Sequence, residues 1–257
     1  MKTSVEKVET PSRFKDYFST VAQEYSRYRP TYPPELFAFL SSLIKSHDIA
    51  WDCATGNGQA AFGLTPHIGK ILASDASERQ IVHAHRHTKI QYVVSSAECS
   101  PFYERSIDLI TIATAIHWFD FEKFYREVNR VMKPNGVIAA WCYGWLTISP
   151  EIDALFHFFK TNVLGAYWTP ERRYVDEEYK TIPFPFDEIL TTPFVIERYW
   201  NIEDVFGYLD TWSSSRLYKE NNGESATEKI RKKLEEAWGG DGQRLITWPV
   251  YMRVGRI

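Results

Sequence analysis

The sequence predicts an α/β fold with a Rossmann-like, mostly parallel sheet. In the first 140 of the 257 residues, short apolar runs alternate with segments of helical periodicity, which is typical of βαβ units. A small-residue loop that contains Gly56 and Gly58 follows the first of these apolar runs. Such loops join a strand to a helix in folds of this class.

Each strand is expected where a short apolar run ends at a polar or small residue. The first run ends in the glycine loop, the second at Asp75 and the third in a Ser-Ser-Ala-Glu stretch. A helix is expected at 121–132, because its apolar residues recur at helical spacing and a Lys-Pro-Asn-Gly sequence ends it. The five strands are expected at 48–54, 70–74, 90–94, 107–114 and 136–141.

Further elements are expected on both sides of this region. Residues 13–43 contain a helical stripe, a proline-containing turn and a second amphipathic helix. After residue 141 the pattern is looser, although apolar spacing still indicates elements. Helices are expected at 150–164, 202–218 and 224–238, and strands at 194–200 and 245–254.

The composition argues against several classes of partner. The formal net charge is −3, which provides no basic field for the phosphates of nucleic acid. Residues 1–10 have no apolar segment of a secretion signal, and no apolar stretch is long enough to span a bilayer. Three well-separated cysteines favour neither disulfides nor a zinc site. We expect a cytoplasmic protein with a small-molecule partner and without nucleic acid, membrane or metal.

The strongest local signal is the stretch Asp-Cys-Ala-Thr-Gly-Asn-Gly that runs from Asp52 to Gly58. A side chain at Gly56 or Gly58 would occupy space that a ligand needs, and such turns often require a positive φ. Asp75 stands 17 positions after Gly58, where a carboxylate can accept hydrogen bonds from both hydroxyls of a ribose. A helix N-cap is the alternative role for Asp75. Together the two features predict a site for a nucleoside-containing cofactor.

The identity of that cofactor is open between two candidates. The spacing Gly56-x-Gly58-x-x-Ala61 also satisfies the relaxed dinucleotide motif, so that an NAD-dependent oxidoreductase is an alternative. S-adenosylmethionine is favoured because Asp52 stands at a strand end where dinucleotide folds usually carry apolar residues. The Ser96-Ala-Glu stretch could frame an adenine ring.

Six segments form an ordered set that is more specific than any one of them. They are Tyr25-Ser-Arg-Tyr-Arg-Pro-Thr-Tyr-Pro, Asp52-Cys-Ala-Thr-Gly-Asn-Gly, Ala73-Ser-Asp-Ala-Ser, Ser96-Ala-Glu, Ala115-Ile-His-Trp-Phe-Asp and Val131-Met-Lys-Pro-Asn-Gly. With them the chain resembles the class I S-adenosylmethionine-dependent methyltransferases, in particular the type 11 small-molecule branch that includes trans-aconitate methyltransferases. The resemblance covers residues 14–145 well and the remainder more faintly.

The resemblance implies a fold and a division of the chain. The sheet would have seven strands, mostly parallel with the last one antiparallel, with helices on both faces and an N-terminal helical cap. Residues 1–45 would form this cap, and 46–145 the cofactor-binding α/β core. Residues 146–257 would supply a substrate-region insertion and the last two strands of the same domain.

The resemblance also implies which residues hold the cofactor. The methionine part would lie against Asp52, Ala54, Gly56 and Gly58, and the ribose would lie against Asp75. The adenine would lie near Ala76, Ser96, Ala97 and Glu98. The sulfonium would lie beside Thr114 and His117, and Tyr25 and Arg29 would also contact the cofactor. The chain departs from the family at Ala54, where a glycine is usual, and at Ser96, where Asp or Asn usually faces the adenine amino group.

The predicted function is methyl transfer from S-adenosylmethionine to a small molecule, with O-methylation of a carboxylic acid as its most specific form and S-adenosylhomocysteine as a product. In-line displacement at a sulfonium needs alignment and exclusion of water. A carboxylate is already ionised, whereas a hydroxyl would benefit from a base, for which His117 is the candidate. A non-catalytic cofactor-binding protein is a further alternative, and the sequence leaves the oligomeric state open. The acceptor site is expected to include Trp118, Tyr143, Trp145, Trp168, Arg172, Trp212 and Arg216.

Overall fold

The computed structural model describes residues 28–257. The first predicted helix, and with it Tyr25, lies outside the described residues. In the described chain one sheet of eight strands has the order β3-β2-β1-β4-β5-β8-β6, and β7 also pairs with β8. The strands are β1 (Ile49–Cys53), β2 (Lys70–Asp75), β3 (Ile90–Val94), β4 (Ile107–Ala113), β5 (Met132–Tyr143), β6 (Asp187–Glu188), β7 (Phe194–Trp200) and β8 (Arg244–Arg256).

The direction of the strands confirms the predicted topology. The pairings among β1 to β5 are parallel, whereas β8 runs antiparallel to β5, β6 and β7. The strand beyond the predicted seven is β6, which has only two residues. β5 begins earlier than predicted, because the Lys-Pro-Asn-Gly segment stays in the strand across a register shift between Ile107 and Leu109 of β4.

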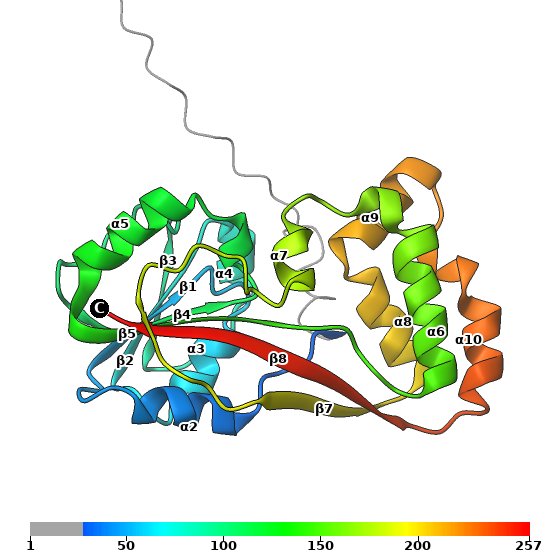
Figure 1. The fold of residues 1–257 in the computed structure, drawn as a ribbon, viewed down its shortest axis with the longest axis horizontal. Coiled ribbons are helices and arrows are strands. Elements are labelled where there is room, and N and C mark those ends of the chain that lie inside the picture. The colour runs from blue at the N-terminus through cyan, green and yellow to red at the C-terminus, as the bar shows by residue number, and fades with distance from the viewer. Residues whose placement is uncertain (1–27) are drawn as a thin grey trace, which may run out of the picture.

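Both faces of the sheet are buried. Successive residues of β1, such as Ala50 and Trp51, belong to two different apolar clusters, as expected when side chains alternate between the faces of a strand. The helices α2 (Pro34–Ser42) and α3 (Gln59–Leu64) cover one face, and α5 (Phe121–Val131) covers the other (Figure 1). α4 (Glu78–Val82) connects β2 to β3. Within residues 28–257, no helix combines the length and apolar character that a bilayer crossing requires.

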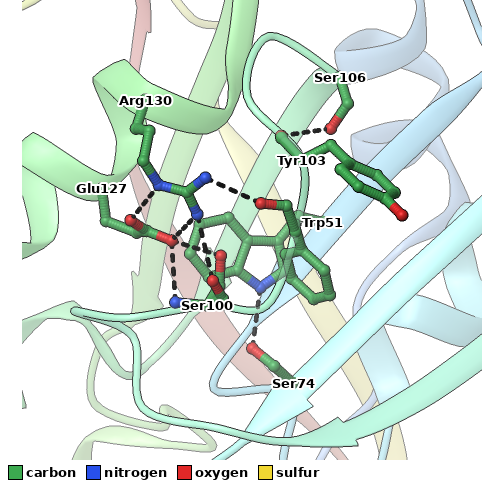
Figure 2. A network of polar contacts seen from close by, with 8 residues as sticks. Trp51, Ser74, Ser100, Tyr103, Ser106, Glu127 and Arg130 are labelled. Carbon is green, nitrogen blue, oxygen red and sulfur yellow. Dashed lines mark hydrogen bonds and ion pairs between the residues drawn. The ribbon is translucent and has the colours of Figure 1, made fainter.

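A polar network attaches α5 to the loop between β3 and β4 (Figure 2). Glu127 accepts hydrogen bonds from the backbone N–H and the hydroxyl of Ser100, and Arg130 binds Glu127 and the carbonyl of Phe102. On the neighbouring strands the Trp51 indole donates to Ser74 Oγ at 2.8 Å. These bonds satisfy polar groups that burial would otherwise leave unpaired.

The helices of the second half of the chain gather at one end of the sheet, beyond β5, as a helical lobe (Figure 1). β5 runs toward this lobe and β8 returns from it. The lobe contains α6 (Pro150–Phe158), α8 (Ile202–Asp210), α9 (Ser213–Asn222) and α10 (Arg231–Trp238), and α7 (Arg172–Asp176) lies between it and the sheet.

Three segments predicted as single helices in this lobe are not regular α-helices throughout. The predicted helix 202–218 is two helices, because Trp212 adopts an extended backbone between them. The predicted helix 150–164 continues beyond α6 as a π-turn at Phe159–Val163. The segment predicted as 224–238 contains a 3-10 turn at Ala226–Lys229 before α10.

Candidate functional site

The loop between β1 and α3 has an unusual backbone. Ala54, Gly56 and Gly58 all have positive φ, at 53°, 56° and 85°. A Cβ on Gly56 would have Gln80 Oε1 as its nearest neighbour, at 4.0 Å, so the space beside this residue is open. A Cβ on Gly58 would lie 2.1 Å from Tyr92 Oη. The expectation that Gly58 leaves room for a ligand is therefore corrected, because the Tyr92 ring fills that space.

The carboxylate of Asp52 fixes this loop through hydrogen bonds. This carboxylate is fully buried and accepts hydrogen bonds from the hydroxyls of Thr55 and Thr111 and from the backbone N–H of Ala61. Burial raises the pKa of Asp52 to about 6 despite these bonds. Asp52 was expected to touch the cofactor. The structure corrects this, because the side chain has no exposed surface and acts on the loop instead.

Asp75 lies at the end of β2 and faces the same loop. Its Oδ2 accepts a hydrogen bond from the backbone N–H of Gly56 at 2.8 Å, and its Oδ1 accepts one from Ser77 at 2.8 Å. The cap of α4 is Ser77, whose hydroxyl accepts from Gln80, so the N-cap alternative for Asp75 is wrong. The carboxylate is half-buried and joins the ends of β1 and β2.

The segment after β3 carries the residues that were expected near an adenine. Ser96 is exposed and forms an isolated bridge with Cys99, and Ala97 is buried. Glu98 Oε1 accepts a hydrogen bond from the backbone N–H of Asp120 at 3.1 Å. Asp120 in turn caps α5 through Lys123 N–H, so this segment is joined to the start of α5.

An aromatic pocket lies between the carboxyl ends of β4 and β5 and the helical lobe. Its cavity volume is about 70 Å³. The rings of Trp145, Trp168 and Trp212 contact one another, with centroids 5.2 to 5.7 Å apart. The residues that line the pocket are Arg29, Thr114, His117, Trp118, Tyr143, Gly144, Trp145, Trp168, Thr169, Arg172, Val175, Tyr208, Trp212 and Ser213.

The structure thus brings together most of the residues expected around an acceptor. Arg216 is the exception, because it does not line the pocket and instead faces Glu220, with 3.7 Å between Nε and Oε1. Arg29 and Thr114, which were expected near the cofactor, are walls of this pocket. Tyr208 was not predicted, because its place in a helical stripe gives no signal that separates a pocket wall from the core.

Two arginines line the pocket, and one of them, Arg172, is paired through its Nε with Asp176 Oδ1 at 3.3 Å. Among the residues that the structure describes, no Asp or Glu lines it. The Arg172 guanidinium lies 4.5 Å from the ring centroid of Trp145 and 4.8 Å from that of Trp168, an arrangement that orients an arginine over aromatic faces. Arg29 donates to Tyr143 Oη at 2.6 Å and to the carbonyl of Thr211 at 3.0 Å.

His117 lies in the 3-10 turn Ile116–Trp118 that follows β4. Its Nδ1 is 2.8 Å from Tyr179 Oη. Burial, with a smaller contribution from Arg172, lowers the pKa of His117 to about 3, so the imidazole is neutral at physiological pH. The contact with Tyr179 was not predicted, since 62 residues separate the two side chains.

Comparisons with known proteins agree on one class of enzyme. Residues 51–140 match a family model described as a methyltransferase domain. A Dictyostelium discoideum protein that is classed by name with the methyltransferases is 32% identical over 95% of this chain and 96% of its own length. A methyltransferase structure from Anaeromyxobacter dehalogenans superposes with a TM-score of 0.83 at 37% identity, over 89% of this chain and 98% of that one.

A Saccharomyces cerevisiae relative is named as S-adenosylmethionine-dependent and is 26% identical over 58% of this chain and 56% of its own length. These matches decide against the NAD-dependent oxidoreductase that the loop motif alone left open. The chain belongs to the S-adenosylmethionine-dependent methyltransferases and has their class I fold.

Proposed function

We propose that this enzyme transfers the methyl group of S-adenosylmethionine to a carboxylate oxygen of a small molecule in the aromatic pocket. The observation that carries the proposal is the charge of that pocket, whose walls contain two arginines and, within the described chain, no acidic residue. Arg172 pairs through its Nε with Asp176 Oδ1 at 3.3 Å, and its two Nη groups would donate to a carboxylate of the acceptor. The surrounding indoles provide apolar area for the rest of the acceptor.

The loop and the end of β2 fit the cofactor. The open space beside Gly56 allows a ligand to approach the backbone, and Asp75 places a half-buried carboxylate, the kind of group that accepts from ribose hydroxyls, next to this loop. When bound, the cofactor supplies an electrophilic methyl group on a sulfonium. The proposed contacts are Ala54, Gly56 and Asp75 with the methionine and ribose parts, Ala76, Ser96, Ala97 and Glu98 around the adenine, and Arg29, Thr114 and His117 toward the aromatic pocket.

The residues of the pocket would align the acceptor and exclude water. Arg172 would orient the carboxylate, and the cluster of Trp145, Trp168 and Trp212 would displace water from around it. A carboxylate is ionised at neutral pH, so no base has to remove a proton. The low pKa of His117 agrees with this requirement, because so weak a base would assist a hydroxyl poorly.

The test separates the class of acceptor from methyl transfer itself. The protein is incubated with methyl-labelled S-adenosylmethionine and a mixture of mono-, di- and tricarboxylic acids, and the products are then treated with alkali. Methyl esters release labelled methanol, whereas ethers and N-methyl or C-methyl products keep the label. We expect label that alkali releases. Label that resists alkali would overturn the carboxylate proposal while leaving methyl transfer in place.

A matched pair of variants tests the role of Arg172. Arg172→Met removes the guanidinium from the pocket, while Arg173→Met removes an exposed one from the next residue. Hydrogen bonds between charged groups contribute about 1.5–3 kcal/mol, so Arg172→Met should raise KM for the acid roughly 10- to 100-fold. Arg173→Met should leave KM unchanged. Equal KM values in the two variants would show that Arg172 does not bind the acceptor.

A further inference from the structure

The contact between His117 and Tyr179 defines where the proton of the imidazole lies. Tyr179 has no exposed surface, and within the described chain its hydroxyl has one hydrogen-bond partner, His117 Nδ1 at 2.8 Å. A buried hydroxyl proton without an acceptor costs about 1–3 kcal/mol. Tyr179 therefore donates, and His117 Nδ1 accepts.

The other nitrogen of the ring must then carry the proton. A neutral imidazole has one donor and one acceptor nitrogen, so accepting at Nδ1 leaves an N–H at Nε2. In the described chain Nε2 makes no hydrogen bond, and it is not sealed from the pocket that His117 lines. The ring thus presents a donor to whatever occupies the pocket.

The backbone around Tyr179 is held in a costly conformation. Glu178 and Tyr179 are consecutive residues in the left-handed region, with φ of 60° and 61°, a conformation that costs on the order of 1 kcal/mol or more for each side chain-bearing residue. Arg253 stabilises the turn, because its Nη1 donates to the carbonyls of Tyr179 and Ile182 at 3.1 and 3.2 Å. The fold thus maintains a strained turn whose central side chain reaches His117.

We infer that Tyr179 is a positioning residue that holds His117 as the Nε2–H tautomer, so that His117 donates a hydrogen bond to an oxygen of the methyl acceptor instead of acting as a base. The acceptor must then arrive with its nucleophilic oxygen already ionised, which selects carboxylates over alcohols. This consequence for the substrate rests on the proposed function. The tautomer itself does not.

The groups around the imidazole keep it in this form. Arg172 of α7 is the charged neighbour that affects His117, and it disfavours a second positive charge. Burial raises the pKa of the Tyr179 hydroxyl and of the Cys142 thiol on β5, so both stay protonated at neutral pH. The pair of His117 and Tyr179 should therefore not titrate between pH 5 and 9.

Long-range ¹H–¹⁵N correlation spectra of the full chain labelled at its histidines read the tautomer directly. The signals of His117 are assigned by their loss in His117→Gln. We expect a protonated Nε2 and an unprotonated Nδ1 from pH 5 to 9, with and without S-adenosylhomocysteine. In Tyr179→Phe, which removes only the hydroxyl, the Nδ1–H form should become populated. A wild-type Nδ1–H signal, or titration between pH 6 and 7, would overturn the inference.

A second experiment compares two substitutions of His117 in the alkali-release assay with the same acid mixture. His117→Gln keeps an N–H donor near the position of Nε2, whereas His117→Leu keeps none. We expect the Gln variant to stay within about threefold of wild type and the Leu variant to lose tenfold or more. Equal losses would contradict the donor role. If no acid forms a methyl ester, the proposed function fails, and the spectra still decide the tautomer.

Discussion

Single residues at the carboxyl ends of the two central strands carry backbone strain. Ala54 after β1 and Thr114 after β4 have φ of 53° and 55°, values that side chains disfavour. Thr114 is fixed by a hydrogen bond from its N–H to the carbonyl of Trp141 and by a contact of its Oγ1 with Tyr32 Oη. Strain of this kind tends to gather at functional sites, and here it lies beside the loop and the pocket.

Replacing Ala54 with glycine tests this strain. Glycine adopts a positive φ freely, which removes a cost of about 1 kcal/mol, but it also makes the unfolded chain more flexible by about 0.5–1 kcal/mol. We expect Ala54→Gly to change the free energy of unfolding by less than about 0.5 kcal/mol in urea titrations. Ala60→Gly, in the right-handed α3, should cost about 1–2 kcal/mol. A similar loss in both variants would contradict the argument.

The residue scale also shows how far the sequence could predict the site. Residue types and spacing placed Gly56 and Asp75 at neighbouring strand ends, and the aromatic residues around one pocket. They did not reveal which way a side chain points. The side chain of Asp52 faces the interior of the loop, and the Tyr92 ring fills the space beside Gly58. Tyr179 belongs to no recognisable motif. Only the folding of the chain brings it into contact with His117.

Among the elements, the loop between β1 and α3 uses its two glycines for different reasons. Beside Gly56 there is open space, whereas the Tyr92 ring, whose hydroxyl donates to the carbonyl of His85, lies against Gly58. Both glycines have positive φ. Alanine at either position is strained, but only at Gly58 does it also collide with a neighbour.

We therefore expect the two alanine variants to differ in stability. Gly56→Ala should cost about 1–2 kcal/mol, from backbone strain alone, and Gly58→Ala should cost about 1–3 kcal/mol more, from overpacking. Urea unfolding measures both. Tyr92→Phe removes the atom nearest to the added methyl group, so combining it with Gly58→Ala should recover part of the extra loss. Equal losses in the free energy of unfolding of the two alanine variants would show that the Tyr92 ring moves aside at no energetic cost.

Elements in the parallel part of the sheet were easier to predict than those of the helical lobe. β3 has the predicted bounds and β2 ends one residue beyond them, because apolar runs with polar ends are local signals. Apolar periodicity continues from α8 into α9, so it conceals the break at Trp212, whose ring packs against Tyr208 and Trp145. The tertiary packing of the Trp212 side chain sets the boundary between α8 and α9. A local sequence pattern does not contain that information.

At the scale of the whole molecule, the site forms where the sheet meets the helical lobe. The parallel core supplies Thr114 and His117, and the lobe supplies Tyr208 and Trp212. The core carries the shared motifs, whereas the segment that builds the acceptor walls has the least regular pattern. For this reason the sequence predicts the family more sharply than it predicts the acceptor.

The stability of the whole molecule should depend on pH through Asp52. Its pKa is about 6 in the folded protein, above the ordinary value of 3.8, so the folded state binds the proton more tightly than the unfolded state. Stability linked to this group is therefore highest below about pH 4, decreases as the pH rises to about 6, and is constant above that. The expected decrease is on the order of 3 kcal/mol.

Asp52→Asn isolates this contribution. The amide oxygen can accept from Ala61 N–H, and the amide nitrogen can donate to the hydroxyl of Thr111, so the variant retains partners for its buried atoms. In urea titrations between pH 4.5 and 7.5, the wild type should lose stability relative to Asp52→Asn as the pH rises. Asp48→Asn is the matched control, because the pKa of the exposed Asp48 is lowered and its effect falls below this range. Parallel curves for the wild type and Asp52→Asn would contradict the raised pKa of Asp52, because ionisation of the buried carboxylate would then cost no folding stability.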